Sequence, residues 1–299
     1  MSGAAGRIEA AIGGARRISA STFPELLLVE SKAHWDQLQS HGLFASRRLV
    51  EPALISLPLP RKIPGFCAGC GKHQELDFTA HHALVAPDGS LNLQLSETGV
   101  CPACRISSRM RFALDIAGHR LRSAAVYMTE QTTNLYACVR HINPGVIGSE
   151  YLGDSIAAGS IQNGVRHEDL HNLSLASESL DLAICLDVLE HVNDPVRACE
   201  ELNRTLKPGG LAIVTFPFFA DREKTTRRAD VSDRGEIRHL LPPEYHGNPL
   251  GGGALVFTEL SWDFLDACRG RGLQADMIHY WSLYRGHFGH DRFACLITK

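Results

Sequence analysis

Residues 181–217 read DLAICLDVLEHVNDPVRACEELNRTLKPGGLAIVTFP, and this stretch decides the fold. Residues 181–186 form a short apolar run of the kind found in buried strands. A helix is predicted to follow, with Asp194 as its N-cap and Pro195 in its first position. Lys207–Gly210 end that helix, and a second apolar run comes after them. Strand, helix and strand in this order predict two parallel strands of an α/β sheet.

Two acids and a histidine follow the first of these strands, namely Asp187, Glu190 and His191. They fall at the carboxyl edge, where such sheets bind ligands. The motifs DVLEHV, DP and LKPGG at this spacing closely resemble the fourth and fifth strands of class I methyltransferases that use S-adenosylmethionine (SAM). The resemblance covers about residues 121–299. It implies an α/β, Rossmann-like, seven-stranded and mostly parallel sheet with helices on both faces, and SAM as the cofactor.

The composition of the 299 residues is that of an ordinary globular protein, with 44% hydrophobic and 21% charged residues. A net charge of −3 provides no general attraction for nucleic acid. No apolar run approaches the roughly 18 residues that span a membrane, and the N-terminal stretch lacks the apolar core of a secretory signal. We therefore predict a cytoplasmic protein without a membrane partner.

Four of the nine cysteines form two knuckles, Cys67-x-x-Cys70 and Cys101-x-x-Cys104. Four thiolates in two such turns predict a closed structural Zn²⁺ site, although a redox dithiol or two unrelated buried pairs would give the same spacing. We expect the intervening chain to form a hairpin of residues 75–79 with residues 91–96. The other five cysteines lie in apolar contexts and are expected to be small buried residues: Cys138, Cys185, Cys199, Cys268 and Cys295.

These features divide the chain into three parts. Residues 1–60 form an N-terminal extension, and residues 61–120 form a small zinc-binding β module with a linking helix. Residues 121–299 form the methyltransferase domain, with a lid insertion at residues 217–257 that is rich in charge, proline and glycine. A long insertion at the ligand-binding edge is more often functional than slack.

The loop after the first domain strand departs from the family pattern because it lacks glycines. We expect Glu130 to accept from the ammonium group of SAM, and Thr132 and Thr133 to hold its carboxylate together with the N-terminus of the next helix. An acid about twenty residues further on suits the ribose hydroxyls. Glu150, with its neighbour Tyr151, is the preferred candidate and Asp154 the alternative.

The resemblance further implies that an acid and a hydrophobe after the third strand contact the adenine. Asp169 and Leu170 occupy this place, after a short strand around residues 165–167. Glu130, Glu150, Asp169 and Asp187 then fall at successive strand ends, which favours a nucleoside cofactor.

Methyl transfer to a hydroxyl requires positioning and often a base. His191 and His246 are the candidate bases, each with a structural role as the alternative, and Tyr245 is expected to position the acceptor. The near-neutral charge and the long lid favour O-methylation of a small molecule, a sugar or a natural-product intermediate.

Two other functions remain open. An RNA methyltransferase with an N-terminal zinc module is favoured by the arginines after the second knuckle, which would contact an anion unless they simply form a solvated helix face: Arg105, Arg109 and Arg111. A binding protein, or an enzyme that uses SAM for chemistry other than methyl transfer, is favoured by the missing glycine loop.

Overall fold

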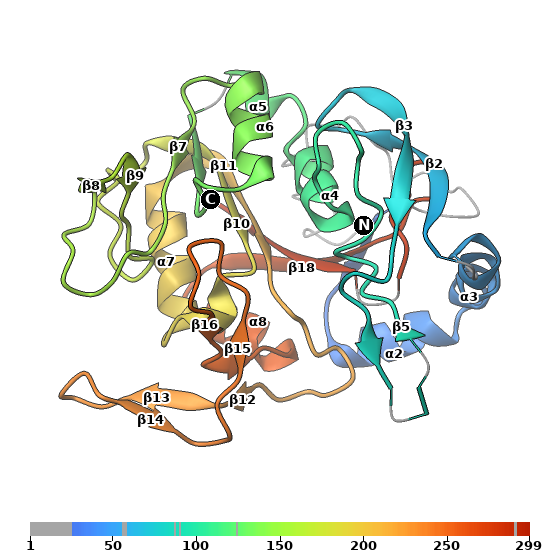
Figure 1. Cartoon of the computed structure of the whole chain (residues 1–299). Coiled ribbons are helices and arrows are strands. Elements are labelled where there is room, and N and C mark those ends of the chain that lie inside the picture. Colours follow the sequence, from blue (N-terminus) through green and yellow to red (C-terminus); the bar gives the residue numbers. More distant parts are fainter. Residues whose placement is uncertain (1–25, 56–58, 87, 90, 124, 290–291) are drawn as a thin grey trace.

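The structure is a computed structural model that describes residues 26–55, 59–86, 88–89, 91–123, 125–289 and 292–299 (Figure 1). Residues 1–25 of the expected N-terminal extension lie outside the described residues. Within the described ranges, no helix is both long and apolar enough to cross a membrane.

A seven-stranded sheet runs through the middle of the molecule (Figure 1). Its strands, in spatial order, are β1 (Leu26–Val29), β18 (Gln274–Tyr280), β19 (Phe293–Thr298), β11 (Leu206–Thr215), β10 (Leu180–Leu186), β6 (Val126–Met128) and β7 (Ile147–Gly148). The four strands from β11 to β7 are parallel to one another, whereas β1, β18 and β19 pair antiparallel. Because β18 is antiparallel to β19, it runs in the same direction as these four strands, while β1 and β19 run against them. The sheet is mixed, and five of its seven strands share one direction, as the expected mostly parallel sheet requires.

The third expected strand of the domain does not join the main sheet. Residues 165–167 form only a short strand, β9 (Val165–Arg166), which pairs with β8 (Ile161–Gln162) outside the main sheet. An isolated β-bridge between Glu150 and His167 joins this segment to the chain that follows β7. The seventh strand of the sheet is instead β1, from the N-terminal extension. Its backbone pairs with the edge of β18 that would otherwise be exposed.

Helices cover both faces of the sheet (Figure 1). One face carries α4 (Ser108–Ala117), α5 (Arg120–Ser123) and α6 (Asn134–Ile142), and the other carries α2 (Lys32–Ser40), α7 (Pro195–Thr205) and α8 (Trp262–Gly270). A further helix, α3 (Gly42–Ile55), follows α2.

The alternation of side chains along β10 explains how two cores form. Leu182 and Ile184 point into the core shared with α4 and α6, while Ala183 and Cys185 point into the core shared with α7 and α8. All four side chains have an exposed fraction of 0%. The strand is thus buried on both faces, as its continuous apolar sequence predicts.

The cysteine module is a pair of small hairpins packed against the sheet. In it β2 (Arg61–Cys67) pairs with β3 (Lys72–Phe78), and β4 (Leu84–Val85) pairs with β5 (Leu91–Asn92). The expected pairing of residues 75–79 with 91–96 is wrong, because β3 finds its partner in the preceding strand across the first knuckle. Leu76 and Phe78 are buried in the same core as the sheet residues, so the module shares the core of the domain.

The insertion after β11 consists of short hairpins. Its strands, with the strand that follows it, are β12 (Thr226–Arg227), β13 (Ala229–Val231), β14 (Ile237–His239), β15 (Tyr245–His246), β16 (Ala254–Leu255) and β17 (Thr258–Glu259). The hairpins β13–β14 and β15–β16 are successive along the chain, and β12 pairs with β17. The β15–β16 hairpin lies beside the short 3-10 helix η1 (Leu189–His191), which follows β10.

The N-cap of α7 is confirmed, because Oδ1 of Asp194 accepts hydrogen bonds from the amides of Val196 (3.1 Å) and Arg197 (3.0 Å). Replacing Asp194 with alanine leaves both amides without this acceptor and should lower the free energy of unfolding by about 1 kcal/mol. Denaturant unfolding would measure the loss. The control is Asp194→Asn, which keeps a side-chain oxygen and should retain most of the stability. An equal loss in both variants would show that the cap does not stabilise the helix.

Candidate functional site

The loop after β6 is fastened by an acid from the neighbouring strand end. Oε1 of Glu150 accepts from the amides of Gln131 (2.8 Å) and Thr132 (2.9 Å) and from the hydroxyl of Thr132 (2.8 Å). Glu150 is 9% exposed. Hydrogen bonds to a buried carboxylate are stronger than neutral ones, so this residue fixes the loop in place.

Glu130 opens that loop and points into the same region. Its carboxylate accepts from the hydroxyl of Thr133, which also caps α6 by accepting from the amide of Tyr136 (3.1 Å). Burial raises the pKa of Glu130 to about 7, and the charges of Glu150 and Asp187 act in the same direction.

A glycine in a strand permits this arrangement. A Cβ atom at Gly148 of β7 would lie 2.8 Å from the carbonyl oxygen of Glu130 and 2.4 Å from the ring of Tyr136. Such contacts are too short for carbon, so only glycine lets the loop lie against β7. The close approach of loop and strand is thus permitted by a glycine in the adjacent strand, while the loop itself has none.

Asp187 follows β10 with a φ of +52°, a region that only asparagine and aspartate enter with any ease among side-chain-bearing residues. Oδ1 of Asp187 accepts from the hydroxyl of Thr215 (2.9 Å), and Oδ2 lies 3.0 Å from Nε of Arg109. Burial raises the pKa of Asp187 to about 6, although Arg109 acts in the opposite direction.

Arg109 comes from α4, in the cysteine module, and joins that module to the strand end. Its Nε is also 2.8 Å from Oε1 of Glu97, and its side chain is 14% exposed. Burial opposes its charge, but Asp187 and Glu97 raise the pKa of Arg109 above its ordinary value. Arg109 is therefore neither on a solvated face nor open to a substrate anion, and both expectations for it are wrong.

The two other arginines of this segment have different roles. Arg105 precedes the helix with a φ of +60°, so it shares no helix face with Arg109. Arg111 is fully buried and donates to backbone carbonyls, including those of Arg285 (2.5 Å) and Gly99 (3.0 Å). The expected basic face does not form.

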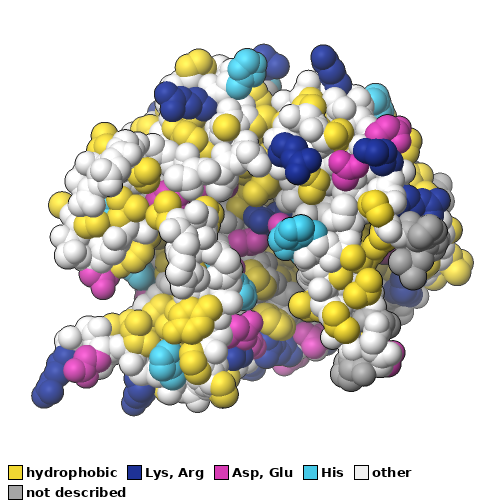
Figure 2. Space-filling view, viewed as in Figure 1, with side chains coloured by type: hydrophobic (Ala, Val, Ile, Leu, Met, Phe, Trp, Pro, Cys, Tyr) yellow, Lys and Arg dark blue, Asp and Glu magenta, His cyan; other side chains and the backbone are white. Residues whose placement is uncertain are grey.

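The strand ends together make an acidic hollow. Figure 2 shows a depression in the middle of the face, with acidic and basic side chains on its floor. The carboxylates whose charges act on one another here, beside the guanidinium of Arg109, are Glu97, Glu130, Glu150, Asp187 and Glu190. An excess of negative charge of this kind favours a cationic ligand.

The residues expected at the adenine and ribose are less closely grouped. Oδ1 of Asp169 accepts from the amide of His171 (2.8 Å), and contact with the His171 ring lowers the pKa of Asp169. Leu170 is buried, at 6% exposure. Tyr151 is 52% exposed and donates a hydrogen bond to Asp154.

A second group of side chains lies just beyond Asp187. Oε1 of Glu190 is 3.5 Å from Nε2 of His191 and 3.7 Å from Nδ1 of His246, and contact with Glu190 raises the pKa of His246. The structure therefore brings both candidate bases together. Tyr245, one residue before His246, points to the opposite face of the hairpin and is 58% exposed, so it does not join this group.

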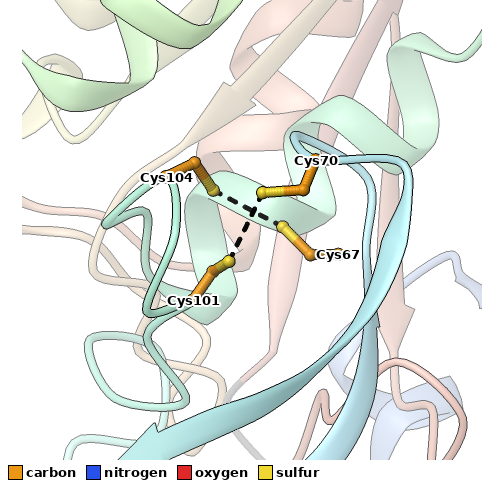
Figure 3. A group of neighbouring side chains, drawn as sticks. All are labelled: Cys67, Cys70, Cys101 and Cys104. Atoms are coloured by element: carbon orange, nitrogen blue, oxygen red, sulfur yellow. Dashed lines mark hydrogen bonds between the residues drawn. The ribbon is translucent and has the colours of Figure 1, made fainter.

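The four knuckle cysteines converge on one point (Figure 3). The Sγ atoms of Cys67 and Cys104 are 3.5 Å apart, as are those of Cys70 and Cys101. Cys138 of α6 was expected to be an ordinary buried residue, but its thiol lies beside this group and donates to the carbonyl of Gly69 (3.6 Å). The first helix of the methyltransferase region thus contacts the cysteine cluster.

A cavity of about 380 Å³ lies elsewhere, between α4, α5 and β18. Its lining includes Phe112, Tyr280 and Trp281, and none of the predicted cofactor or catalytic residues reaches it. We therefore place the functional site at the strand ends, where the acids gather.

Residues 128–214 match the family model described as a methyltransferase domain. The match indicates that this segment is a methyltransferase domain. It contains the strand ends from Glu130 to His191 but neither the cysteine module nor His246.

A curated relative is dimethylglycine N-methyltransferase of Parasynechococcus marenigrum (strain WH8102), which is 28% identical over 110 residues. The match covers 36% of this chain and 39% of the relative, so the chain matches about two fifths of that protein's length.

Similar solved structures include a SAM-dependent methyltransferase from Mesorhizobium loti and DesVI from Streptomyces venezuelae, each 15% identical to this chain. The first alignment covers 66% of this chain and 100% of the other, with a TM-score of 0.38. The second covers 63% and 91%, with a TM-score of 0.39.

Replacing Arg109 with methionine should destabilise the protein by about 3 kcal/mol at about pH 8, because buried acids lose their partner. The folded-state pKa values of Glu130 and Asp187 are raised, to about 7 and about 6. These groups therefore favour folding most at low pH, and their contribution is lost as the pH rises through those values. Without Arg109, the stability lost between about pH 5.5 and about pH 8 should be larger. The difference in free energy of unfolding between the variant and the wild type should therefore be smaller at about pH 5.5.

Denaturant unfolding at both pH values would measure the difference, with Arg109→Lys as the control that retains the charge. A defect of equal size at both pH values would mean that Arg109 acts through packing alone.

Proposed function

We propose that this protein transfers a methyl group from SAM to a hydroxyl oxygen of a small molecule, such as a sugar or a natural-product intermediate. The observation that carries the proposal is the acidic hollow of Glu130, Glu150 and Asp187 at the carboxyl edge, within the segment that matches the methyltransferase family. SAM carries one positive charge on its ammonium group and another on its sulfonium group. The excess of carboxylates in this hollow would attract both charges.

The residues present fit SAM, with one change from the sequence expectation. The hydroxyl of Thr132 donates to Glu150 and that of Thr133 donates to Glu130, so neither is free to hold the cofactor carboxylate. The amides at the start of α6 are the donors that remain for it. When bound, SAM supplies a methyl group activated by a positively charged sulfur.

Each acid would contact a different part of the cofactor. Glu130, with its raised pKa, would hold the ammonium, and Asp187 would lie nearest the reacting end. Glu150 would accept from the ribose hydroxyls while it holds the loop, and Asp169 and Leu170 would contact the adenine. Tyr151 borders this group at the ribose end, with its ring 5.4 Å from that of His167.

The acceptor would enter beside the β15–β16 hairpin. His191 and His246 border the hollow there and would stand next to the acceptor oxygen, where one of them could take its proton. Tyr245 is exposed on the outer face of the same hairpin, so its positioning role stays a prediction for the outer part of an acceptor.

Several of the basic residues that favoured an RNA acceptor are paired with acids or buried. In the lid, Arg227 pairs with Asp230 at 2.7 Å, and Arg228 forms an ion pair with Glu259. Arg109 and Arg111 are buried. These contacts leave less free positive charge for phosphates than the sequence indicates, which favours the small-molecule acceptor.

We further propose that the four cysteines hold one structural Zn²⁺. Tetrahedral zinc with Zn–S bonds of about 2.3 Å places its sulfurs about 3.8 Å apart, close to the two Sγ–Sγ distances of 3.5 Å. Four protein ligands leave no open position, so this ion would stabilise the module and α4 rather than act in the reaction.

Calorimetry with SAM tests the main proposal. The wild-type protein should bind SAM, and Glu130→Gln should weaken binding at least tenfold, about 1.4 kcal/mol, because one anionic contact to the ammonium is lost. Glu75→Gln, on the exposed side of β3, is the matched control and should bind normally.

The affinity should fall as the pH decreases from about 8 to about 5.5, because the free carboxyls take up protons around their raised pKa values of about 7 and about 6. Absence of SAM binding would overturn the proposal. Mass spectrometry of products formed in a metabolite extract would then identify the transfer, and a gain other than one methyl group would show different SAM chemistry.

The purified protein should contain one zinc ion per chain, measurable by elemental mass spectrometry. Cys101→Ser should lose zinc and melt at a lower temperature, because Cys101 is a fully buried member of the cluster. Cys138→Ala removes the neighbouring thiol and should keep the metal. Retention of zinc in the Cys101 variant, or its loss in the Cys138 variant, would assign the ligands differently.

A further inference from the structure

Glu190 is a buried carboxylate for which the described residues provide no hydrogen-bond partner. The residue is 1% exposed, and neither Oε1 nor Oε2 has a hydrogen bond within the described part of the chain. An unpaired buried carboxylate is costly, and such groups are usually paired with a cation or bound to a metal. Within 4 Å of its Oε1, the ion pairs of the described residues include the rings of His191 and His246.

His191 presents a free nitrogen to this carboxylate. Its Nδ1 lies 2.9 Å from the carbonyl oxygen of Leu255, and a carbonyl only accepts, so Nδ1 carries the proton. In the neutral ring, Nε2 then carries the lone pair, and Nε2 is the atom that faces Glu190. Histidine ligands in metal sites are oriented by a hydrogen bond of this kind from the other nitrogen.

His246 is arranged like His191, with a carboxylate in place of the backbone carbonyl. Its Nε2 lies 3.4 Å from Oε1 of Glu244, while its Nδ1 faces Glu190 at 3.7 Å. A proton on Nε2, directed to Glu244, leaves the Nδ1 lone pair free. The two rings stand nearly perpendicular, with an interplanar angle of 87° and centroids 5.1 Å apart.

The spacing of the three donor atoms fits an ion between them. The atoms all lie within 4.8 Å of one another, and the two distances from Glu190 are 3.5 and 3.7 Å. Ligands at about 2.1 Å from a metal are about 3.0 to 3.4 Å apart in octahedral or tetrahedral geometry. The gaps are thus too long for hydrogen bonds and slightly wider than those of a loaded site.

We propose that Glu190, His191 and His246 bind one divalent transition-metal ion that holds the hydroxyl of the methyl acceptor. Two imidazoles and one carboxylate favour zinc, manganese, iron or cobalt over magnesium and calcium, which prefer oxygen ligands. Three protein ligands leave coordination positions open, as in catalytic rather than structural sites.

The chemistry rests on the proposed function. A hydroxyl bound to a divalent ion loses its proton near neutral pH, which removes the need for a histidine base. The reaction would form the O–CH₃ bond, break the S–CH₃ bond with its electron pair going to sulfur, and release the hydroxyl proton to water. Glu190 follows Asp187 by three residues, in the 3-10 helix η1 directly after β10, which places the ion beside the expected reacting end of the cofactor.

The site also depends on the lid. His246 and the Leu255 carbonyl both belong to the β15–β16 hairpin, and the amide of Phe257 donates to the carbonyl of Glu190 (2.8 Å). An ion would therefore join this hairpin to the end of β10.

Titration with Mn²⁺ of the full-length protein carrying one zinc ion per chain, at the four thiolates, tests the site when it is followed by electron paramagnetic resonance, because manganese has little preference for thiolates. The wild-type protein should bind one Mn²⁺ per chain. Glu190→Gln and His246→Ala should each weaken that binding at least tenfold. His239→Ala, an exposed histidine of the β13–β14 hairpin, is the matched control and should bind as the wild type does.

Binding of no Mn²⁺, or equal binding by the wild type and His246→Ala, would overturn the inference and leave the cluster as a buried carboxylate neutralised by imidazolium. His246 is 34% exposed on a surface hairpin, so its variant should fold even where that of Glu190 does not.

SAM calorimetry on the same samples separates the two proposals. Normal SAM binding without Mn²⁺ binding would reject the metal site alone, and Mn²⁺ binding without SAM binding would reject the methyltransferase function alone.

Discussion

The ion pair between Arg109 and Asp187 is the interaction on which the site depends. Several carboxylates meet at the strand ends, and Arg109 is the guanidinium placed among them. It arrives on α4, directly after the second cysteine knuckle, and it also contacts Glu97 of the same module. The cysteine module therefore supplies the positive charge that allows the methyltransferase strand ends to be acidic.

This dependence explains why the module and the domain share a core. The buried side chains of β2 and β3 pack with those of the sheet, Arg111 donates to carbonyls of the C-terminal loop, and Cys138 of α6 lies beside the knuckles. A closed metal site at that point would fix α4 and α6 together, and both helices border the acidic hollow. The proposed zinc would thus act on the cofactor site through position alone.

Much of the fold could be predicted from the sequence where local pattern and tertiary packing agree. The stretch from 181 to 217 has a buried apolar run and an Asp-Pro helix start, and each produces the expected element. The expected stop at Lys207–Gly210 is wrong, because α7 already ends at Thr205 and these residues lie in β11. The pairing of β1 with β18 could not be predicted, because it joins segments far apart in the chain. The partner of β3 was missed because β2 contains Pro64, and the prolines of this stretch indicate an extended linker rather than a strand.

The site was predicted in part. The sequence places Glu130, Glu150 and Asp187 at strand ends, but it does not show that Glu150 fastens the loop or that the threonine hydroxyls are already engaged. The partner of Arg109 was missed because ion pairs between distant segments leave no periodic signal. Glu190 and His191 are adjacent in a motif, whereas their grouping with His246 follows only from the docking of the lid hairpin.

Gly148 has a consequence for how proteins of this kind are recognised. The steric freedom that a nucleotide-binding loop needs is usually sought in the loop itself, as a run of glycines. Here the loop bears ordinary side chains, and the space is made by the absence of one in the neighbouring strand. A sequence motif defined for the loop alone would not detect such a chain. The constraint belongs to a pair of facing backbones, and either of them can satisfy it.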